Sequence, residues 1–187
     1  MKLFKIFIIL FLIFGCSNQN PTDERISVFE EKLGVKETNA LNLLVSDFEK
    51  KLIKIYPDLT IEKGYRQYLT DIVSDSTTDW NKFKFQSDKT NSEFHKSGLW
   101  NEIYTSSKTY DRITNDSVDA LRYNSVGKYM RALYQIKDSD SLVKVYSEIR
   151  QAAGMMPNEL FVSGILSSNP DFTDYFHKRI VVLEFSF

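Results

Sequence analysis

The strongest constraint on the fold is a run of apolar residues at helical spacing between residues 38 and 56. Apolar side chains recur there every three or four residues, while Glu49, Lys50 and Lys51 occupy the opposite face. Pro57 follows, and a proline disfavours helical backbone in the residue before it. The pattern predicts an amphipathic helix that ends at Tyr56. Its apolar stripe consists of Leu41, Leu44, Val45, Phe48, Leu52 and Ile55.

The same spacing predicts helices along most of the remaining chain. Only 7 Gly and 4 Pro occur, which argues against a sandwich of many short strands. We expect an all-α fold, an irregular bundle of about seven to eight antiparallel helices, with degenerate helical-hairpin repeats as a variant. The expected helices cover 22–33, 38–56, 60–74, two short stretches within 91–106, 116–136, 139–153, a stretch from Pro157 and 171–187, with loops at 74–90 and 106–115.

Individual residues mark several of these boundaries. Thr22 and Ser139 are the expected N-caps of two helices, because a hydroxyl can accept from the free N–H groups of the first turn. Gly34, Gly98 and Gly154 are expected to end or break helices. The 14 Phe and 10 Tyr predict a core rich in aromatic rings.

The last residues permit a second interpretation. Leu183, Phe185 and Phe187 alternate with polar residues, as in a strand with one buried face. The helical pattern of 171–179 continues through them, so one continuous helix is the favoured prediction. A short C-terminal strand is the alternative.

The first residues have the features of a secretory signal peptide. Lys2 and Lys5 give a positive start, and Ile6–Phe14 is an unbroken apolar run before Gly15 and Cys16. A bilayer span takes about 20 apolar residues. This shorter run with a basic flank therefore predicts a signal peptide rather than a permanent membrane helix. Cys16 is the only cysteine, so it cannot form an internal disulfide.

The segment Leu12-Ile13-Phe14-Gly15-Cys16 resembles the lipobox of bacterial lipoprotein precursors. The match lies in the hydrophobic Ile13, the small Gly15 and Cys16, while Phe14 is bulkier than is usual at its place. The resemblance implies that the Cys16 thiol receives a diacylglycerol and that the peptide before it is removed. It also implies acylation of the new amine, for example by palmitate. No cofactor beyond this covalent lipid on Cys16 is expected.

The resemblance divides the chain into three segments: a cleaved signal peptide (1–15), a polar tether (16–21) and a single helical domain (22–187). Ser17 follows the cysteine, whereas an aspartate there favours retention in the inner membrane of such lipoproteins. The resemblance therefore implies a protein of the cell envelope, lipid-anchored in the outer membrane and facing the periplasm.

Charge excludes one class of partner. The chain carries 24 basic and 25 acidic residues, so no basic surplus exists to attract a nucleic acid or an anionic lipid surface. We expect membrane contact through the lipid anchor, an envelope protein as a candidate partner, and no nucleic acid.

The sequence contains no readable catalytic or metal-binding motif. His95 and His177 lie in no His-Glu-x-x-His or cysteine-based pattern, and no nucleophile elbow or phosphate-binding glycine loop occurs. A calcium loop starting at Asp138 would need glycine and glutamate where Val143 and Ile149 stand. We expect no metal and no enzymatic activity, and a hydrolase with an unfamiliar pair of acids is the least favoured alternative.

Four aromatic residues in the irregular 80–110 region are the candidate ligand-binding residues: Trp80, Trp100, Tyr104 and Tyr110. Such rings stack on sugars or pack against partner proteins, and loops often carry function. The competing and more common interpretation is that they fill the core. The favoured hypothesis is a non-enzymatic envelope lipoprotein that binds a protein partner or supports envelope assembly. The alternative is a glycan- or peptide-binding lipoprotein that uses the aromatic residues of this region.

Overall fold

The computed structural model describes residues 23–74 and 80–186, so the expected signal peptide and lipobox lie outside the described residues. In these ranges the fold is helix-dominated, with one small two-stranded antiparallel sheet. The elements are α2 (Glu24–Leu33), α3 (Val35–Ile55), α4 (Ile61–Ser74), α5 (Trp80–Phe83), α6 (Asp88–Lys96), α7 (Leu99–Ile103), β1 (Tyr104–Asp111), β2 (Asp116–Tyr123), α8 (Lys128–Ile136), the 3₁₀ turn η2 (Lys137–Ser139), α9 (Ser141–Ala153), α10 (Asn158–Ser167) and α11 (Tyr175–Glu184).

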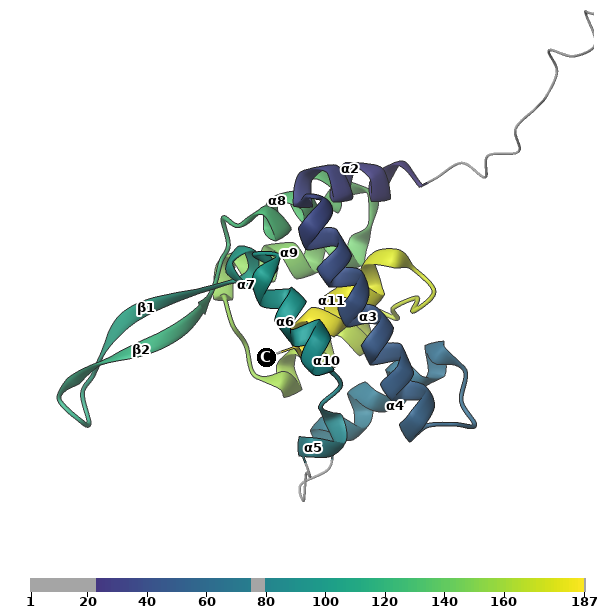
Figure 1. Cartoon of the computed structure of the whole chain (residues 1–187), viewed down its shortest axis with the longest axis horizontal. Helices are drawn as coiled ribbons and strands as arrows, with labels where there is room; N and C mark the ends of the chain where they lie inside the picture. Colours follow the sequence, from purple (N-terminus) through teal and green to yellow (C-terminus); the bar gives the residue numbers. More distant parts are fainter. Residues whose placement is uncertain (1–22, 75–79, 187) are drawn as a thin grey trace, which may run out of the picture.

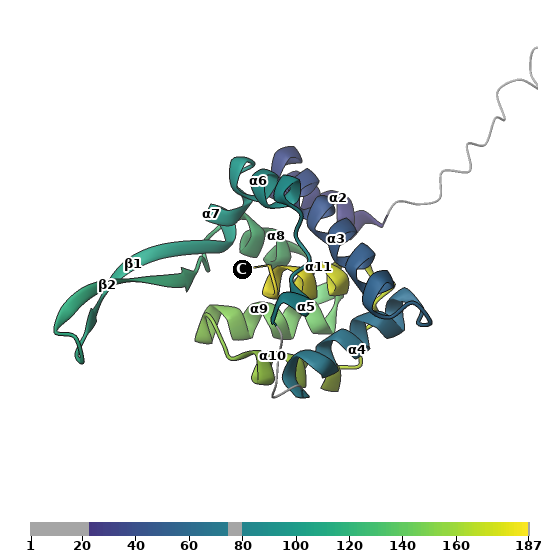
Figure 2. The ribbon, with the colours of Figure 1, turned by 60° about the horizontal axis from the view of Figure 1, so that its bottom comes forward.

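Helix α11 lies at the centre of the helical body, with α3 and α9 packed beside it (Figure 2). From Arg179 to Glu184 every residue of α11 is buried. A helix that is buried all round must be surrounded by other elements, as in the middle of a larger protein. The helical body is therefore built around α11, which is the last described helix in the chain.

The core is rich in aromatic rings, as the composition predicts. Phe48 lies between Tyr65 and Tyr68, with ring centroids 4.9 and 4.7 Å apart. Phe29 of α2 meets Tyr129 of α8 edge to face at 6.1 Å. The Phe48–Tyr68 and Phe29–Tyr129 contacts are edge to face, the arrangement that the ring quadrupoles favour, whereas Phe48 and Tyr65 are tilted by 40°. The largest fully buried side chains are Tyr65, Tyr68, Tyr129, Phe29, Phe48, Phe94, Phe172 and Phe176.

The predicted helices before residue 104 are confirmed in type, but the loop expected at 74–90 is wrong in part, because it contains the short helix α5 and the start of α6. Helix α3 ends at Ile55 before Pro57, and five of the six residues of its predicted stripe are buried. Gly34 ends α2 at a φ of 103°, a backbone conformation that glycine tolerates best. Gly98, with a φ of 89°, separates α6 from α7 as expected. Asp23, and not Thr22, caps α2 by accepting from the Arg25 N–H, and Thr22 lies outside the described residues.

The prediction for residues 106–127 is wrong. These residues were expected to form a loop and the start of a helix, but most of them form the hairpin β1–β2, and α8 begins only at Lys128. Val118 and Leu121 suggested a helix because they lie three positions apart. In a strand this spacing puts the two side chains on opposite faces, and both are exposed. Val126, also expected inside, is 74% exposed.

The prediction for the C-terminal segment is right in type and wrong in extent. Asp174 caps α11 by accepting from the N–H groups of Phe176 and His177, so the helix starts at Tyr175 and not at Asp171. The helix continues to Glu184, which rules out a strand there, and Phe187 lies outside the described residues. Similarly, Asp140 caps α9 in place of Ser139. In both cases a carboxylate takes the capping role.

The hairpin and the short helices before it determine where the candidate sites lie. The hairpin extends away from the helical body in both views (Figures 1 and 2). Helix α7 leads directly into the hairpin, whereas α5 lies at the far end of the body beside α4 (Figure 1). In the part of the chain that the structure describes, no helix is both long enough and apolar enough to cross a membrane.

Candidate functional site

The structure brings two of the four predicted aromatic residues into contact: the ring centroids of Trp100 and Tyr104 lie 4.6 Å apart, while Tyr110 lies elsewhere. Trp100 is partly buried and lines a cavity. Tyr104 is 3% exposed, and its hydroxyl donates to the Leu183 carbonyl at 3.1 Å, so it belongs to the core. Tyr110 is 61% exposed on the hairpin. The side chain of Trp80 lies outside the described part of the chain. Trp100 is the one of the four that the structure places at a cavity within the described ranges.

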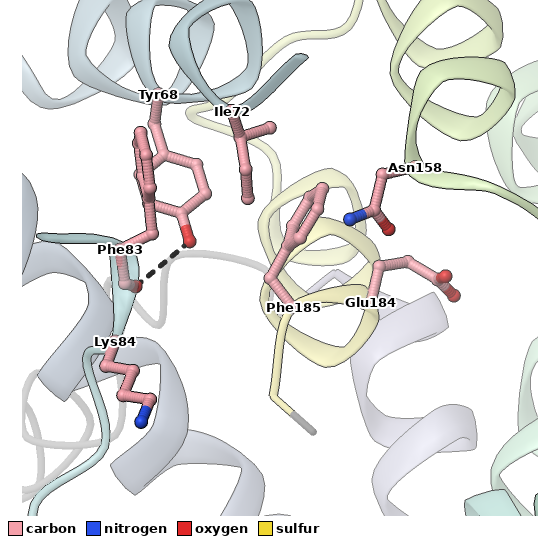
Figure 3. Close-up of a pocket in the computed structure, with 7 residues that line it drawn as sticks. All are labelled: Tyr68, Ile72, Phe83, Lys84, Asn158, Glu184 and Phe185. Carbon is pink, nitrogen blue, oxygen red and sulfur yellow. Dashed lines mark hydrogen bonds between the residues drawn. The ribbon is translucent and has the colours of Figure 1, made fainter. Parts of the chain in front are cut away.

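The cleft consists of two adjoining hollows that share Lys84 and Phe185. The larger, of about 580 Å³, is bordered by the α5–α6 connection, α6, Trp100 and the end of α11. The smaller, of about 190 Å³, lies between α4, α5, α10 and α11 (Figure 3). Phe185 lines both hollows and reaches toward Ile72 in the smaller one, where Tyr68 donates to the Phe83 carbonyl at 3.2 Å (Figure 3). The volume of the larger hollow falls in the range of about 300–1,000 Å³ typical of small-molecule sites.

The wall that carries Lys84 and Asp88 is held in place by hydrogen bonds to distant elements. Ser87 caps α6 and also donates from its hydroxyl to Asp47 of α3 at 2.7 Å. The Gln86 amide donates to the Ser186 carbonyl at 2.5 Å. These bonds connect the α5–α6 segment to α3 on one side and to the end of α11 on the other.

The floor of the smaller hollow contains a buried ion pair. Glu184 accepts from the Arg150 Nε at 3.1 Å and from the Tyr146 hydroxyl at 2.5 Å. Burial raises the pKa of Tyr146 well above its ordinary value, so this hydroxyl stays protonated and can donate. Arg150 also donates to the Gly154 carbonyl at 2.6 Å. With its charge paired in this way, Glu184 is suited to a structural role rather than to proton transfer.

The hairpin is attached to the body by a pair of tyrosines at its root. Tyr104 and Tyr123 stand opposite each other in the sheet, and both are buried. The Tyr123 hydroxyl lies 3.2 Å from that of Tyr146 and 3.4 Å from the Met130 sulfur. Together with the bond from Tyr104 to the Leu183 carbonyl, these contacts connect the root to α8, α9 and α11.

Beyond its root the hairpin is surrounded by solvent. None of the residues from 105 to 122 is buried, on either face of the sheet. We call this segment, 105–122, the arm. The turn at its end is ordered by local bonds: Tyr110 hydrogen-bonds to Asn115, and Asp111 accepts from the Ile113 N–H at 2.8 Å. Ile113 is 95% exposed.

Sequence reasoning missed a further cluster, in which Arg25 joins three helix caps: Asp23 of α2, Asp140 of α9 and Asp174 of α11. The Arg25 guanidinium lies 3.4 Å from Asp140 and 3.3 Å from Asp174, and His177 lies 3.2 Å from Asp140. Ligand atoms of Asp140, Asp174 and His177 lie within 4.8 Å of one another, a spacing that could hold a metal. However, a cation already lies at the centre of this cluster, because the Arg25 guanidinium pairs with Asp140 and Asp174 as well as with Asp23. From the sequence, the cap of α9 was expected at Ser139 and the start of the last helix before Asp174, and no local pattern indicated that Arg25, more than 100 residues away in the chain, meets these two aspartates.

The described part of the chain thus defines a class: a helix-dominated domain with a central helix, a projecting two-stranded arm and an aromatic-walled cleft. Comparison with family models, with curated proteins and with solved structures found no match to this chain.

Proposed function

We propose that this protein is a lipid-anchored lipoprotein of the bacterial envelope and acts there as a non-enzymatic protein-interaction or assembly module. The arm is the surface that makes the contact. Its projection from the body, with exposed residues on both faces, is the observation that carries the proposal.

The energetics of the arm support this role. An isolated two-stranded hairpin is only marginally stable in water, because it buries little surface to offset the ordering of its backbone. The arm adds no buried residue to the core, yet its root is connected by the Tyr104 and Tyr123 hydroxyls to the body. A segment that contributes little to folding but is held in a fixed direction is suited to contact another molecule. Its outer strand edges can accept a partner strand.

The anchor follows from the lipobox resemblance, with the lipid on Cys16 and the tether 16–21 leading to α2. In this proposal the lipid holds the protein at the periplasmic face of the outer membrane, and the arm engages an envelope protein. No cofactor, metal or nucleic acid takes part.

The test is site-specific photocrosslinking of the full-length protein in intact cells. A photoreactive amino acid at Ile113 (95% exposed, at the arm tip) should give one discrete adduct with a second protein. The matched control carries the same group at Val35, which is 78% exposed on α3 of the body. Indistinguishable adduct patterns at the two positions would contradict the arm as the contact surface.

A further inference from the structure

We propose that the cleft formed by the two hollows that share Lys84 and Phe185 binds an oligosaccharide. This site is independent of the arm and goes beyond the interaction proposed above. The proposal names a smaller site than the sequence-based hypothesis of a glycan- or peptide-binding region. Of the predicted aromatic residues whose side chains the structure describes, Trp100 lines this cleft.

The aromatic walls provide the first argument. Phe85, Trp100 and Phe185 border the larger hollow. Trp100 is held by Tyr104 and His95, with ring centroids 4.6 and 4.9 Å away and planes tilted by 45° and 36°. Because an aromatic face is electron-rich, it attracts the polarised C–H groups on the face of a pyranose ring. The partly buried Trp100 is fixed by these neighbours, so the part of the wall that it forms is ordered before a ligand binds.

The polar groups provide the second argument. Lys84, Asp88 and Asn91 all border the larger hollow and are exposed. Within the described ranges none of the three side chains forms a hydrogen bond or an ion pair. Sugar hydroxyls both donate and accept, and this set offers them an ammonium donor, a carboxylate acceptor and an amide that does both. The opposite charges of Lys84 and Asp88 suit a ligand without net charge.

The adjoining hollows match an extended ligand. Because Lys84 and Phe185 border both spaces, a chain of sugar units can pass from one hollow to the other while it contacts these two side chains. The hydrogen bonds of Ser87 and Gln86 hold one wall in position before a ligand arrives. Preorganisation of this kind lowers the entropic cost of binding.

A peptide fits the cleft less well. Peptide recognition depends on a strand edge or on apolar pockets for side chains. Ile72 is the one aliphatic residue among those that line either hollow, and it lies in the smaller one. The strands of the described chain, β1 and β2, border neither hollow.

The test titrates full-length protein in detergent with cellotetraose, chitotetraose and maltotetraose, followed by isothermal calorimetry. We expect at least one of them to bind with a dissociation constant of about 1 mM or tighter. Lys84→Met and Asn91→Ala are exposed changes that should leave the fold intact and weaken binding at least about threefold each. Trp100→Ala should weaken it at least about tenfold.

Two controls distinguish oligosaccharide binding in the cleft from partner binding by the arm and from peptide binding. Tyr110→Ala removes an exposed aromatic ring from the arm and should leave saccharide affinity unchanged, whatever becomes of the partner adduct at Ile113. If no tetrasaccharide binds, or if all three cleft variants bind as well as wild type, the proposal is overturned. Binding of a tetrapeptide in place of all three saccharides would overturn it as well.

Discussion

At the scale of single residues, the Arg150–Glu184 pair is the charge interaction on which stability depends most. The two side chains are 4% and 7% exposed. Removing one partner of a buried ion pair leaves the other charge without compensation, which costs about 3–5 kcal/mol. We therefore expect Glu184→Ala to lower the free energy of unfolding by about that amount in urea titrations.

The arm provides a matched control for this prediction. Lys108 and Asp119 also form an ion pair, at 3.2 Å, but their side chains are 68% and 66% exposed. Solvent screens such a pair almost completely. Lys108→Ala should therefore leave the urea midpoint unchanged, and equal losses in the two variants would show that burial does not decide the outcome.

Asp140 makes the stability dependent on pH. Burial alone would raise its pKa, but hydrogen bonds from the Val143 N–H and from His177 outweigh this effect, so the pKa lies below its ordinary value. A carboxyl with a lowered pKa in the folded state contributes stability above its unfolded pKa of about 3.9. That contribution is lost as the pH falls through the folded value.

We therefore expect the free energy of unfolding to fall as the pH drops below about 4. In Asp140→Asn the difference between pH 7 and pH 3, measured by urea titration, should be smaller than in wild type. Asp119→Asn changes an exposed carboxyl and should keep the wild-type difference. A full acid-induced loss in Asp140→Asn would assign the effect to other carboxyls.

At the scale of elements, the arm should be separable from the body. Tyr104 and Tyr123 are directly opposite in the sheet, so a two-residue Asn-Gly turn can replace residues 105–122. Because none of the removed residues is buried, the armless variant should unfold cooperatively within a few degrees of wild type in thermal circular dichroism. Loss of cooperative unfolding would show that the arm is part of the folding unit.

The two kinds of element also differ in how well the sequence predicted them. Helix α3 was predictable because its apolar stripe faces the core, and burial of a stripe imposes the helical period. The arm has no buried face, so its strands lack the alternation of apolar and polar residues that indicates a half-buried strand. Val118 and Leu121 lie three positions apart, a spacing that is typical of one face of a helix. The cleft was only half predictable: Trp100 was a candidate, but Phe185 reaches it from a distant helix that no local pattern connects to it.

At the scale of the whole molecule, the proposed anchor should decide where the protein is found. Cells fed radiolabelled palmitate should incorporate label into wild type and none into Cys16→Ser. A variant in which a cleavable, non-lipidated signal peptide replaces residues 1–16 should move from the membrane pellet to the soluble envelope fraction. Wild type without label, together with a variant that stays in the pellet, would remove the basis for the anchor.

The central position of α11 has a consequence for how the body assembles. During synthesis α2, α3 and α4 are made first. Helix α3 can pack early on α4 and α6, but the partners of α2 in α8 and of α3 in α11 come much later in the chain. Until α8 and α11 have been made, the apolar residues of α2 and α3 that pack against them remain exposed to solvent. The core around α11 can therefore close only after the last described helix has been made.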